Sequence, residues 1–352
     1  KWEDCLLIFN ANSKEHLPEY EQPVKKYISS LSGRKNYNIW YDTIDNKAFS
    51  VEQPRETHFG KDHSVNCWQD KFLLQEKISS CKNARRYVEE TVRYWGGSML
   101  NQASKDNMIL NDHCIASNPD NYFNDYTGKD LLIVCGGPSV NEIAWENLSY
   151  DYIWSCNEFY LNQKIIDNSI IPDLVTMTPH FPLLGNEKLE KYVGDHGTRV
   201  SFEIERGRIP KEIDSVKDFA KEYPNKSMFF HTWYRSAPGV GPRLVAYAAT
   251  LGIKNIFVVG LDGRHESESD GNLTHAFNGN KNVPNWFRRY GMRFQIRQFV
   301  AFWDYIKCLA EINDFNVYNL GEGCGYNVSA NITKDLFPIP EEMKKKLEGP
   351  SK

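Results

Sequence analysis

Residues 131–140 read LLIVCGGPSV, in which strand-forming residues run directly into two glycines, a proline and a serine. A buried strand followed by such a turn and then a helix is typical of α/β proteins. Glycines at this place let backbone N–H groups approach a phosphate, and the dipole of the next helix favours an anion. The stretch is neither G-x-G-x-x-G nor a Walker loop, since no Lys-Ser/Thr follows. Two interpretations stay open from the stretch alone, namely a tight turn and a cradle for a nucleotide phosphate.

The pattern becomes regular from residue 129 onward. Strands are expected at 130–135, 150–156, 173–178, 227–233, 255–260 and 316–321, and helices at 141–148, 164–170, 242–252 and about 293–313. Strands that alternate with short helices imply a parallel sheet covered on both faces. The predicted fold class is therefore α/β, a Rossmann-like and mostly parallel sheet with helices on both faces, plus an N-terminal α/β extension or small lobe.

Three regions are predicted along the chain. Residues 1–128 form the N-terminal extension or small lobe, residues 129–338 form the main domain, and residues 339–352 form a C-terminal tail. Within the first region we expect strands at 5–9 and 37–42, helices near 18–32 and 70–100, and a linker or long loop at 101–128, which is rich in Asn, Asp and Ser.

Composition limits the classes of function. The chain has 352 residues and a formal net charge of −4, so a large basic surface for nucleic acid is not indicated. No apolar run reaches the ~18 residues that span a bilayer, and no transmembrane segment is expected. The eight cysteines include no C-x-x-C pair, which favours a reduced, cytoplasmic location. Five N-x-S/T sequons favour secretion instead, but such sequons also arise by chance in an Asn-rich chain. A homo-oligomer is left open.

Polar residues follow several of the predicted strands at their carboxyl ends. Asn157 follows the second strand, Thr178 ends the third, and Asp262 follows the strand at 255–260. Ligands of parallel sheets collect at this edge, so we expect these residues to line a cleft. Asn157 offers both a donor and an acceptor to a nucleobase or sugar hydroxyl. A cap for the helix that follows is an equally good interpretation of Asn157.

Three stretches resemble known families. CGGPSVNEIAWENLSYDYIWSCNEFY resembles the opening of bacterial sialyltransferases that use CMP-activated sugars, which carry G-x-G-P-S and then C-N-x-F-Y. NSIIPDLVTMTPH resembles a segment of Maf flagellin glycosyltransferases and of MptE-like pterin pyrophosphokinases. PGVGPRLVAYAATLGIKNIFVVGLDG, with the later DGNLTHAF, is similar to both groups. The resemblance covers about residues 129–325 and leaves the N-terminal third unexplained.

The resemblance implies a nucleotide-sugar site in the main domain. The residues that it assigns to the donor are Gly136, Gly137, Pro138 and Ser139 at the phosphate, Asn157 and Thr178 at the nucleotide, and Gly239 and Gly241 in a small-residue turn. Thr178 departs from the asparagine that sialyltransferases place there. Asp262 matches the acidic residue after the strand. A side chain at Gly137 is expected to fill the space meant for phosphate while leaving the fold intact.

The general base is the largest departure from the family. Arg288-Arg289-Tyr290 stands near the place of the sialyltransferase histidine, so His275, in a Thr-His-Ala sequence of the Maf type, becomes the candidate base. The alternative for His275 is a loop histidine with a structural hydrogen bond. Asp262, His180 and His265 are the fallback candidates for accepting the proton.

Three functions follow from these motifs. The first is a metal-independent glycosyltransferase whose donor, CMP-linked as first choice, is a substrate, so no cofactor is required. The second is an MptE-like pyrophosphokinase with ATP and Mg²⁺, in which Asp262 holds the metal. The third is a non-catalytic nucleotide-binding protein. The acceptor is not identified by the sequence: a glycan, a protein side chain or a modified nucleic acid each fits.

Overall fold

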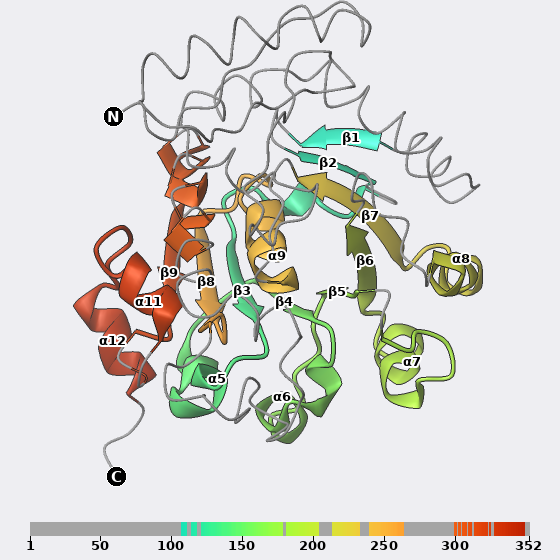
Figure 1. Cartoon of the computed structure of the whole chain (residues 1–352), viewed down its shortest axis with the longest axis horizontal. Helices are drawn as coiled ribbons and strands as arrows, with labels where there is room; N and C mark the ends of the chain where they lie inside the picture. Colours follow the sequence, from blue (N-terminus) through green and yellow to red (C-terminus); the bar gives the residue numbers. More distant parts are fainter. Residues whose placement is uncertain are drawn as a thin grey trace, which may run out of the picture.

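The strand that carries LLIV lies in the interior of a wide sheet in the computed structural model of the chain (Figure 1). The structure describes residues 107–110, 114–117, 121–178, 181–203, 213–232, 239–263 and, except for 301, 304, 308, 312, 323, 325 and 326, residues 299–348. The strands and helices predicted before residue 101 lie outside the described residues.

The described residues form a nine-stranded sheet of order β1-β2-β7-β6-β5-β4-β3-β8-β9. The strands are β1 (Asn107–Leu110), β2 (Cys114–Ser117), β3 (Asp130–Val134), β4 (Tyr152–Cys156), β5 (Leu174–Thr176), β6 (Arg199–Glu203), β7 (Ser227–Thr232), β8 (Asn255–Val259) and β9 (Asn316–Asn319). From β7 to β9 every neighbouring pair is parallel, whereas β1 and β2 add to the β7 edge in antiparallel fashion. The predicted fold class, a Rossmann-like and mostly parallel α/β sheet, is confirmed.

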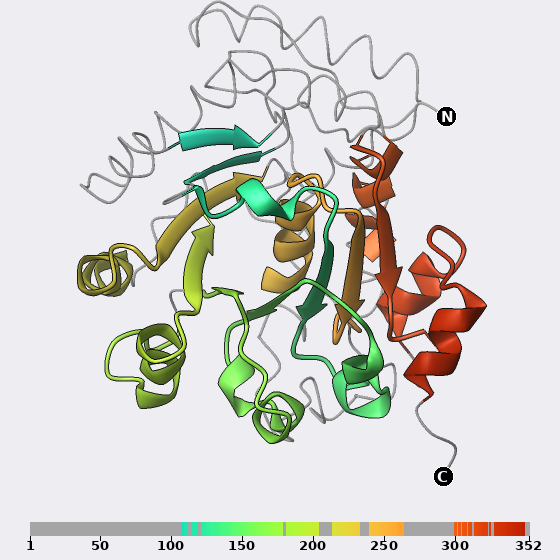
Figure 2. The same ribbon diagram turned by 180° about the vertical axis from the view of Figure 1, so that it is seen from behind.

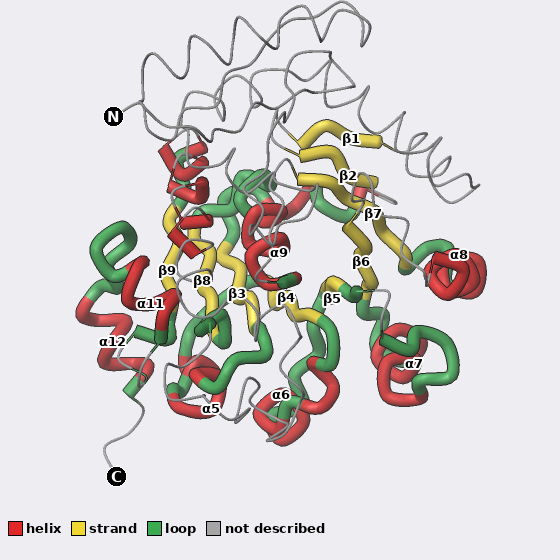
Figure 3. The backbone as a smooth tube through the Cα atoms, in the orientation of Figure 1, coloured by secondary structure: helices red, strands yellow, loops and turns green. Residues whose placement is uncertain are grey.

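Helices cover both faces of this sheet, as Figure 3 shows. They are α5 (Ser139–Glu142), α6 (Gln163–Asp167), α7 (Glu187–Gly194), α8 (Ile213–Glu222), α9 (Val240–Ala248), α11 (Val328–Thr333) and α12 (Glu341–Leu347), with 3-10 turns η6 (Asn124–Tyr126), η7 (Trp145–Asn147) and η8 (Phe159–Leu161). Alternate residues of β3 belong to two separate cores. Leu131 and Ile133 pack with α9, whereas Leu132 and Val134 pack with residues of α5, α6, α7 and α8. Burial on both faces explains the unbroken apolar run.

Helix α9 lies on one face of the central strands, and Figure 2 shows the same strands from behind. Every residue of α9 except Arg243 is buried. The helix begins at the carboxyl edge of the sheet, because a Cβ atom on Gly241 would lie 2.9 Å from Cys135 Sγ and 2.9 Å from Leu261 Cδ1. Glycine at position 241 thus allows the helix to pack directly on the ends of β3 and β8.

Three segments of the described chain differ from what the sequence predicts. The segment 101–128, predicted as a linker, contributes β1, β2 and η6. Strand β6 was not predicted, because Arg199, Ser201 and Glu203 interrupt its apolar residues; within the sheet, Ser201 Oγ lies 2.7 Å from Thr176 Oγ1 in a hydrogen bond. Residues 341–347, predicted as part of a tail, form α12 and add Leu347 to the core.

The strand order reverses direction at β3, which lies between β4 and β8. Strands β4 to β7 extend the sheet to one side of β3, and β8 and β9 extend it to the other. Such a switch point opens a crevice at the carboxyl ends of the two central strands, where ligands of open α/β sheets bind. In this chain that position lies between the Gly136–Ser139 loop and Asp262, which are in direct contact. No helix in the described part of the chain is long and apolar enough to cross a membrane.

Replacing Leu347 tests whether α12 belongs to the folded domain. Its side chain is buried, and the backbone carbonyl of Leu347 accepts a 3.0 Å hydrogen bond from Ala144 N–H, beyond α5. We expect Leu347→Ala to lower the free energy of unfolding by about 2–5 kcal/mol, measured by chemical denaturation. The exposed neighbour Lys345→Ala serves as control, and an equally small effect of both changes would contradict the assignment.

Candidate functional site

The switch-point crevice is occupied by the side chain of Asp262, which is 7% exposed. Its Oδ2 atom accepts a hydrogen bond from Ser139 N–H (2.7 Å), and its Oδ1 atom accepts from Ser139 Oγ (2.5 Å) and Asn327 Nδ2 (2.7 Å). Burial raises the pKa of Asp262, while these donors act in the opposite direction. Both carboxylate oxygens therefore bind groups of the chain itself, and the contacts of Asp262 are those of a structural anchor.

Most N–H groups of the glycine-rich loop are also bonded within the chain. Besides the bond from Ser139, the bonds are Gly137 N to Gly260 O (2.8 Å), Val140 N to Gly137 O (3.3 Å) and Asn141 N to Pro138 O (2.9 Å). The hydroxyl of Ser139 is engaged too, since it also accepts from Gly260 N–H at 3.0 Å. Among the described residues the Gly136 N–H has no partner, and Gly136 and Pro138 are half-buried. The loop thus offers a ligand one backbone donor instead of a full phosphate cradle.

Position 137 needs a glycine for a reason other than the predicted space for a phosphate. A Cβ atom there would lie 2.5 Å from Asp262 Oδ2 and 2.6 Å from the Gly260 carbonyl oxygen. The space beside Gly137 is therefore filled by Asp262 and by the end of β8. A larger residue at 137 would disturb the fold itself, which corrects the expectation that it would leave the fold intact.

Asn157 lies at the carboxyl end of β4 with its amide held in one orientation. Its Oδ1 atom accepts from the backbone N–H of Thr178 at 3.0 Å and from Thr178 Oγ1 at 3.3 Å. A backbone N–H can only donate, so the atom facing it is the amide oxygen, and the Nδ2 group has no partner among the described residues. Asn162, rather than Asn157, caps the next helix by accepting from Lys164 N–H. The structure thus removes the capping interpretation of Asn157.

The backbone of Asn157 is left-handed, with φ of 49°. Asparagine tolerates this conformation better than most residues do. The predicted site residue Gly239 is also in a conformation that favours glycine, with φ of 116°, and a Cβ atom there would meet nothing within 4 Å. Gly136, Pro138, Asn157, Thr178 and Gly239 are all half-buried. These predicted site residues remain partly open to a ligand, whereas Gly137, Ser139, Gly241 and Asp262 are buried.

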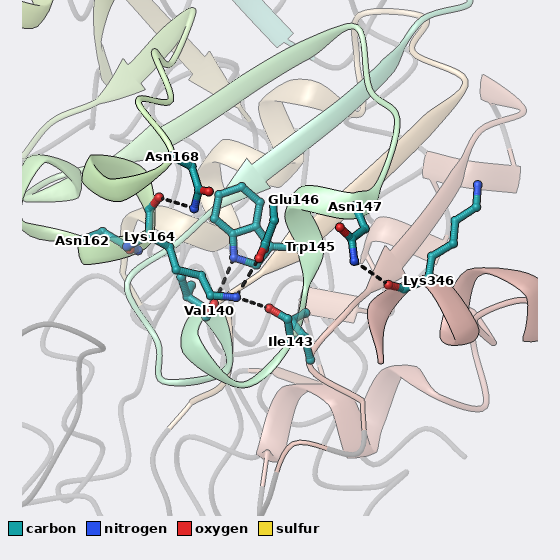
Figure 4. Close-up of polar contacts among 9 residues, drawn as sticks. All are labelled: Val140, Ile143, Trp145, Glu146, Asn147, Asn162, Lys164, Asn168 and Lys346. Carbon is teal, nitrogen blue, oxygen red and sulfur yellow. Dashed lines mark hydrogen bonds and ion pairs between the residues drawn. The ribbon is translucent and has the colours of Figure 1, made fainter. Parts of the chain in front are cut away.

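The segments that follow the loop and Asn157 are tied together by Lys164, as Figure 4 shows. Lys164 Nζ donates to the carbonyl oxygen of Ile143, at the end of α5, and lies 3.3 Å from Glu146 Oε2. Trp145 Nε1 in turn donates to Val140 O at 3.0 Å. Lys164 on α6 thus fixes the chain that leaves the glycine-rich loop.

Sequence reasoning did not single out Arg243, Glu203 or Asn327. Arg243 Nη1 lies 2.6 Å from Glu203 Oε2 and forms a largely buried ion pair. Asn327 caps α11, accepting from Ala330 N–H at 2.8 Å, while its Nδ2 group holds Asp262. Arg243 lies inside the stretch PGVGPRLVAYAATLG, whereas Glu203 ends β6, and only Asn327 carries a local signal, a polar residue directly before a helix.

The candidate bases other than Asp262 lie outside the described residues. His275, His180 and His265 belong to this group, as do Arg288, Arg289 and Tyr290. The assignment of His275 as base stays a prediction. Within the described ranges no group of three or more His, Cys, Asp or Glu side chains is arranged to hold a metal ion.

Solved sialyltransferase structures from Campylobacter jejuni are similar to this chain at low identity. The monofunctional alpha-2,3-sialyltransferase Cst-I is 15% identical, with 64% of this chain and 83% of that chain covered and a TM-score of 0.38. CstII in complex with the substrate analogue CMP-3FNeuAc is 16% identical, with coverage of 58% and 84% and a TM-score of 0.36. An alpha-2,3-sialyltransferase in apo form is 15% identical, with coverage of 65% and 86% and a TM-score of 0.37. No family model and no curated protein matches the chain.

Replacing Asp262 tests its role as an anchor. In Asp262→Asn an amide group would point a donor at Ser139 N–H or at Asn327 Nδ2, leaving buried groups unpaired. We expect the free energy of unfolding to fall by about 1–3 kcal/mol, measured by urea denaturation. Asp218→Asn, an exposed substitution of the same kind, should change it by less than ~0.5 kcal/mol. Unchanged stability of Asp262→Asn would refute the anchor.

Proposed function

We propose that the chain is a glycosyltransferase that uses a nucleotide-activated sugar, with a CMP-linked sugar as the donor. The observation that carries the proposal is the juxtaposition of Gly136 and Asn157 at the carboxyl edge. Val134 and Ser155 are register partners on β3 and β4, so the two residues follow directly paired strand ends. Each offers an N–H donor without a partner among the described residues. The sialyltransferase-like motifs of the sequence lie at these same positions.

The orientation of Asn157 limits what it can recognise. Because Thr178 N–H holds the amide oxygen, the Nδ2 group can bind only a hydrogen-bond acceptor of the ligand. A phosphate oxygen and the carbonyl oxygen of a pyrimidine both satisfy this requirement. The start of α9 at the same edge adds the positive end of a helix dipole, which favours the anionic part of the donor. Both features support a nucleotide ligand.

The proposed reaction is transfer with a single displacement. The acceptor hydroxyl oxygen attacks the anomeric carbon of the sugar and forms the glycosidic bond, while the bond from that carbon to the phosphate oxygen breaks. The bonding electrons leave with the nucleotide phosphate, and His275 takes the proton of the hydroxyl. The leaving phosphate accumulates charge, which donors such as Gly136 N–H stabilise. The acceptor class is open, and the cytoplasmic location and homo-oligomer stay predictions from the sequence.

The pyrophosphokinase alternative needs ATP and Mg²⁺, with Asp262 as a metal ligand. Both oxygens of Asp262 bind Ser139 and Asn327 instead, and this arrangement supports the metal-independent transfer. Thermal-shift titrations with CMP, UDP, GDP and ATP, with and without Mg²⁺, separate the candidates. Stabilisation by CMP without metal supports the transferase, and stabilisation by ATP that requires Mg²⁺ would favour the kinase. CMP binding without turnover of any CMP-sugar would indicate a binding protein.

Two substitutions of Asn157 test its role in binding without straining the backbone. Asn157→Gly keeps the left-handed conformation that alanine would strain, and removes the amide. Asn157→Asp keeps an oxygen for Thr178 and replaces the donor by a negative oxygen. We expect both to weaken CMP binding by about 1–3 kcal/mol in calorimetric titrations. Wild-type affinity in Asn157→Asp would show that Nδ2 does not contact the ligand, and Asn225→Asp, an exposed substitution of the same kind before the start of β7, serves as control.

Replacement of His275 tests the proposed base. His275→Ala should lower the release of CMP from a CMP-activated sugar by about 10²–10⁴-fold, with CMP affinity little changed. The wild-type rate should fall as the pH drops below about 6.5, because a protonated imidazole cannot accept the proton, and this dependence should disappear in the variant. His196→Ala, an exposed histidine of the described region, is the control. Normal turnover in His275→Ala would contradict the proposed base and would mean that another histidine accepts the proton.

A further inference from the structure

Two cysteines lie opposite each other at the carboxyl ends of the neighbouring strands β3 and β4. Val134 of β3 and Ser155 of β4 are register partners. Cys135 and Cys156 are the next residues, so they face each other across the same parallel pair. Both pack in the core that contains α9, and both are free cysteines. The Cys135 side chain points to the start of α9, because a Cβ atom on Gly241 would lie 2.9 Å from its Sγ atom.

The spacing of the two strands suits a disulfide bond. Neighbouring strands lie about 4.8 Å apart, and a disulfide spans Cα atoms that are about 4.4–6.8 Å apart. The two sulfur groups share a hydrogen bond, which together with burial raises the pKa of the Cys135 thiol. A disulfide would draw the Cβ atoms to about 3.8 Å from each other and so strain the two strand ends. Strained disulfides are readily reduced, which makes such a bond reversible.

The two thiols differ in their access to solvent. Cys156 is half-buried, whereas Cys135 is 6% exposed. A small oxidant therefore meets Cys156 first, and the protonated Cys135 thiol beside it can act as the resolving group. Cysteines that merely fill a core behave as small apolar residues and need no second thiol as a neighbour.

We propose that Cys135 and Cys156 form a redox modification site, in which hydrogen peroxide converts the two thiols into a disulfide that weakens binding of the sugar donor. Peroxide oxidises the Cys156 thiol to a sulfenic acid and is itself reduced to water. The Cys135 sulfur then attacks the Cys156 sulfur. The S–S bond forms as the S–O bond breaks, and the hydroxyl group leaves as a second water with the Cys135 proton. A dithiol reductant reverses the reaction by thiol–disulfide exchange.

The effect on the donor follows from the position of the two cysteines in the chain. Gly136 directly follows Cys135, and Asn157 directly follows Cys156. A bond that draws the two strand ends together changes the distance between the Gly136 N–H and the Nδ2 group of Asn157, which are the two donors of the proposed site. The effect on binding rests on the proposed function, whereas formation of the disulfide does not.

Mass spectrometry of one peptide tests whether the bond forms. Trypsin cleaves after Lys129 and next after Lys164, so the peptide 130–164 contains both cysteines and no other cysteine. The folded protein is treated with hydrogen peroxide, free thiols are blocked with iodoacetamide, and the digest is analysed without reductant. We expect this peptide to lose the mass of two hydrogen atoms and to escape alkylation. An alkylated peptide, added oxygen atoms or a link to another peptide would overturn the proposal.

Calorimetric titration measures the effect on the donor site. The Kd of CMP should rise by about 5–100-fold after peroxide treatment, as expected when hydrogen bonds to a ligand are lost. It should return to its original value after treatment with dithiothreitol. Cys156→Ser should abolish both the disulfide and this response, and Cys135→Ala is a second variant for the same purpose. Cys324→Ser changes another half-buried free cysteine and should leave both intact.

The outcomes separate this inference from the proposed function. If the reduced wild type binds none of the nucleotides of the thermal-shift panel, the proposed function fails together with the effect on binding, while the peptide still decides whether the disulfide forms. If the reduced wild type binds CMP and the disulfide forms without changing its Kd, only the control of binding is overturned. An equal response to peroxide in Cys156→Ser and Cys324→Ser would overturn it as well.

Discussion

The buried carboxylate of Asp262 holds together three parts of the chain that are distant in the sequence. It accepts hydrogen bonds from Ser139, which starts α5, and from Asn327, which caps α11, while its own backbone follows β8. A carboxyl group in this buried environment is stable only because its oxygens are matched by donors. The close packing of Gly137 and Gly260 beside it follows from the same contact. The crevice expected at the switch point is thus filled by the protein itself.

Because Asp262 fills that position, the residues that remain open to a ligand lie elsewhere on the carboxyl edge of the sheet. Gly136 remains half-buried beside the end of β3, Asn157 follows β4, and Thr178 follows β5. Arg243 reaches the same region from α9. The groups that remain open at this edge include the Gly136 N–H and the Nδ2 group of Asn157, which are complementary to phosphate and carbonyl oxygens. These donors suit the nucleotide part of the proposed sugar donor better than they suit activation of an acceptor, a role that the proposal gives to His275.

The central part of the fold was predictable because its strands are buried on both faces. Runs such as LLIV at 131–134 and NIFVV at 255–259 have no other common explanation in an α/β pattern, and both became central parallel strands. Strands β1, β2 and β6 were not predicted, because they contain polar residues or follow Asn-rich sequence. Their polar groups are accommodated by partners on neighbouring strands, as Ser201 and Thr176 show, and such pairing cannot be read from a single segment.

The sequence alone determined the fold class, the order of the central elements and the positions of Gly136 and Asn157 at strand ends. These depend on local residue patterns, which act over a few neighbours along the chain. Only the tertiary structure decided that Asp262 is an anchor and which end of the Asn157 amide is free. It also decided that Arg243 is paired with Glu203. Each of these depends on a hydrogen bond or ion pair between residues more than 20 positions apart, and the partner of a polar side chain is fixed by packing rather than by sequence neighbours.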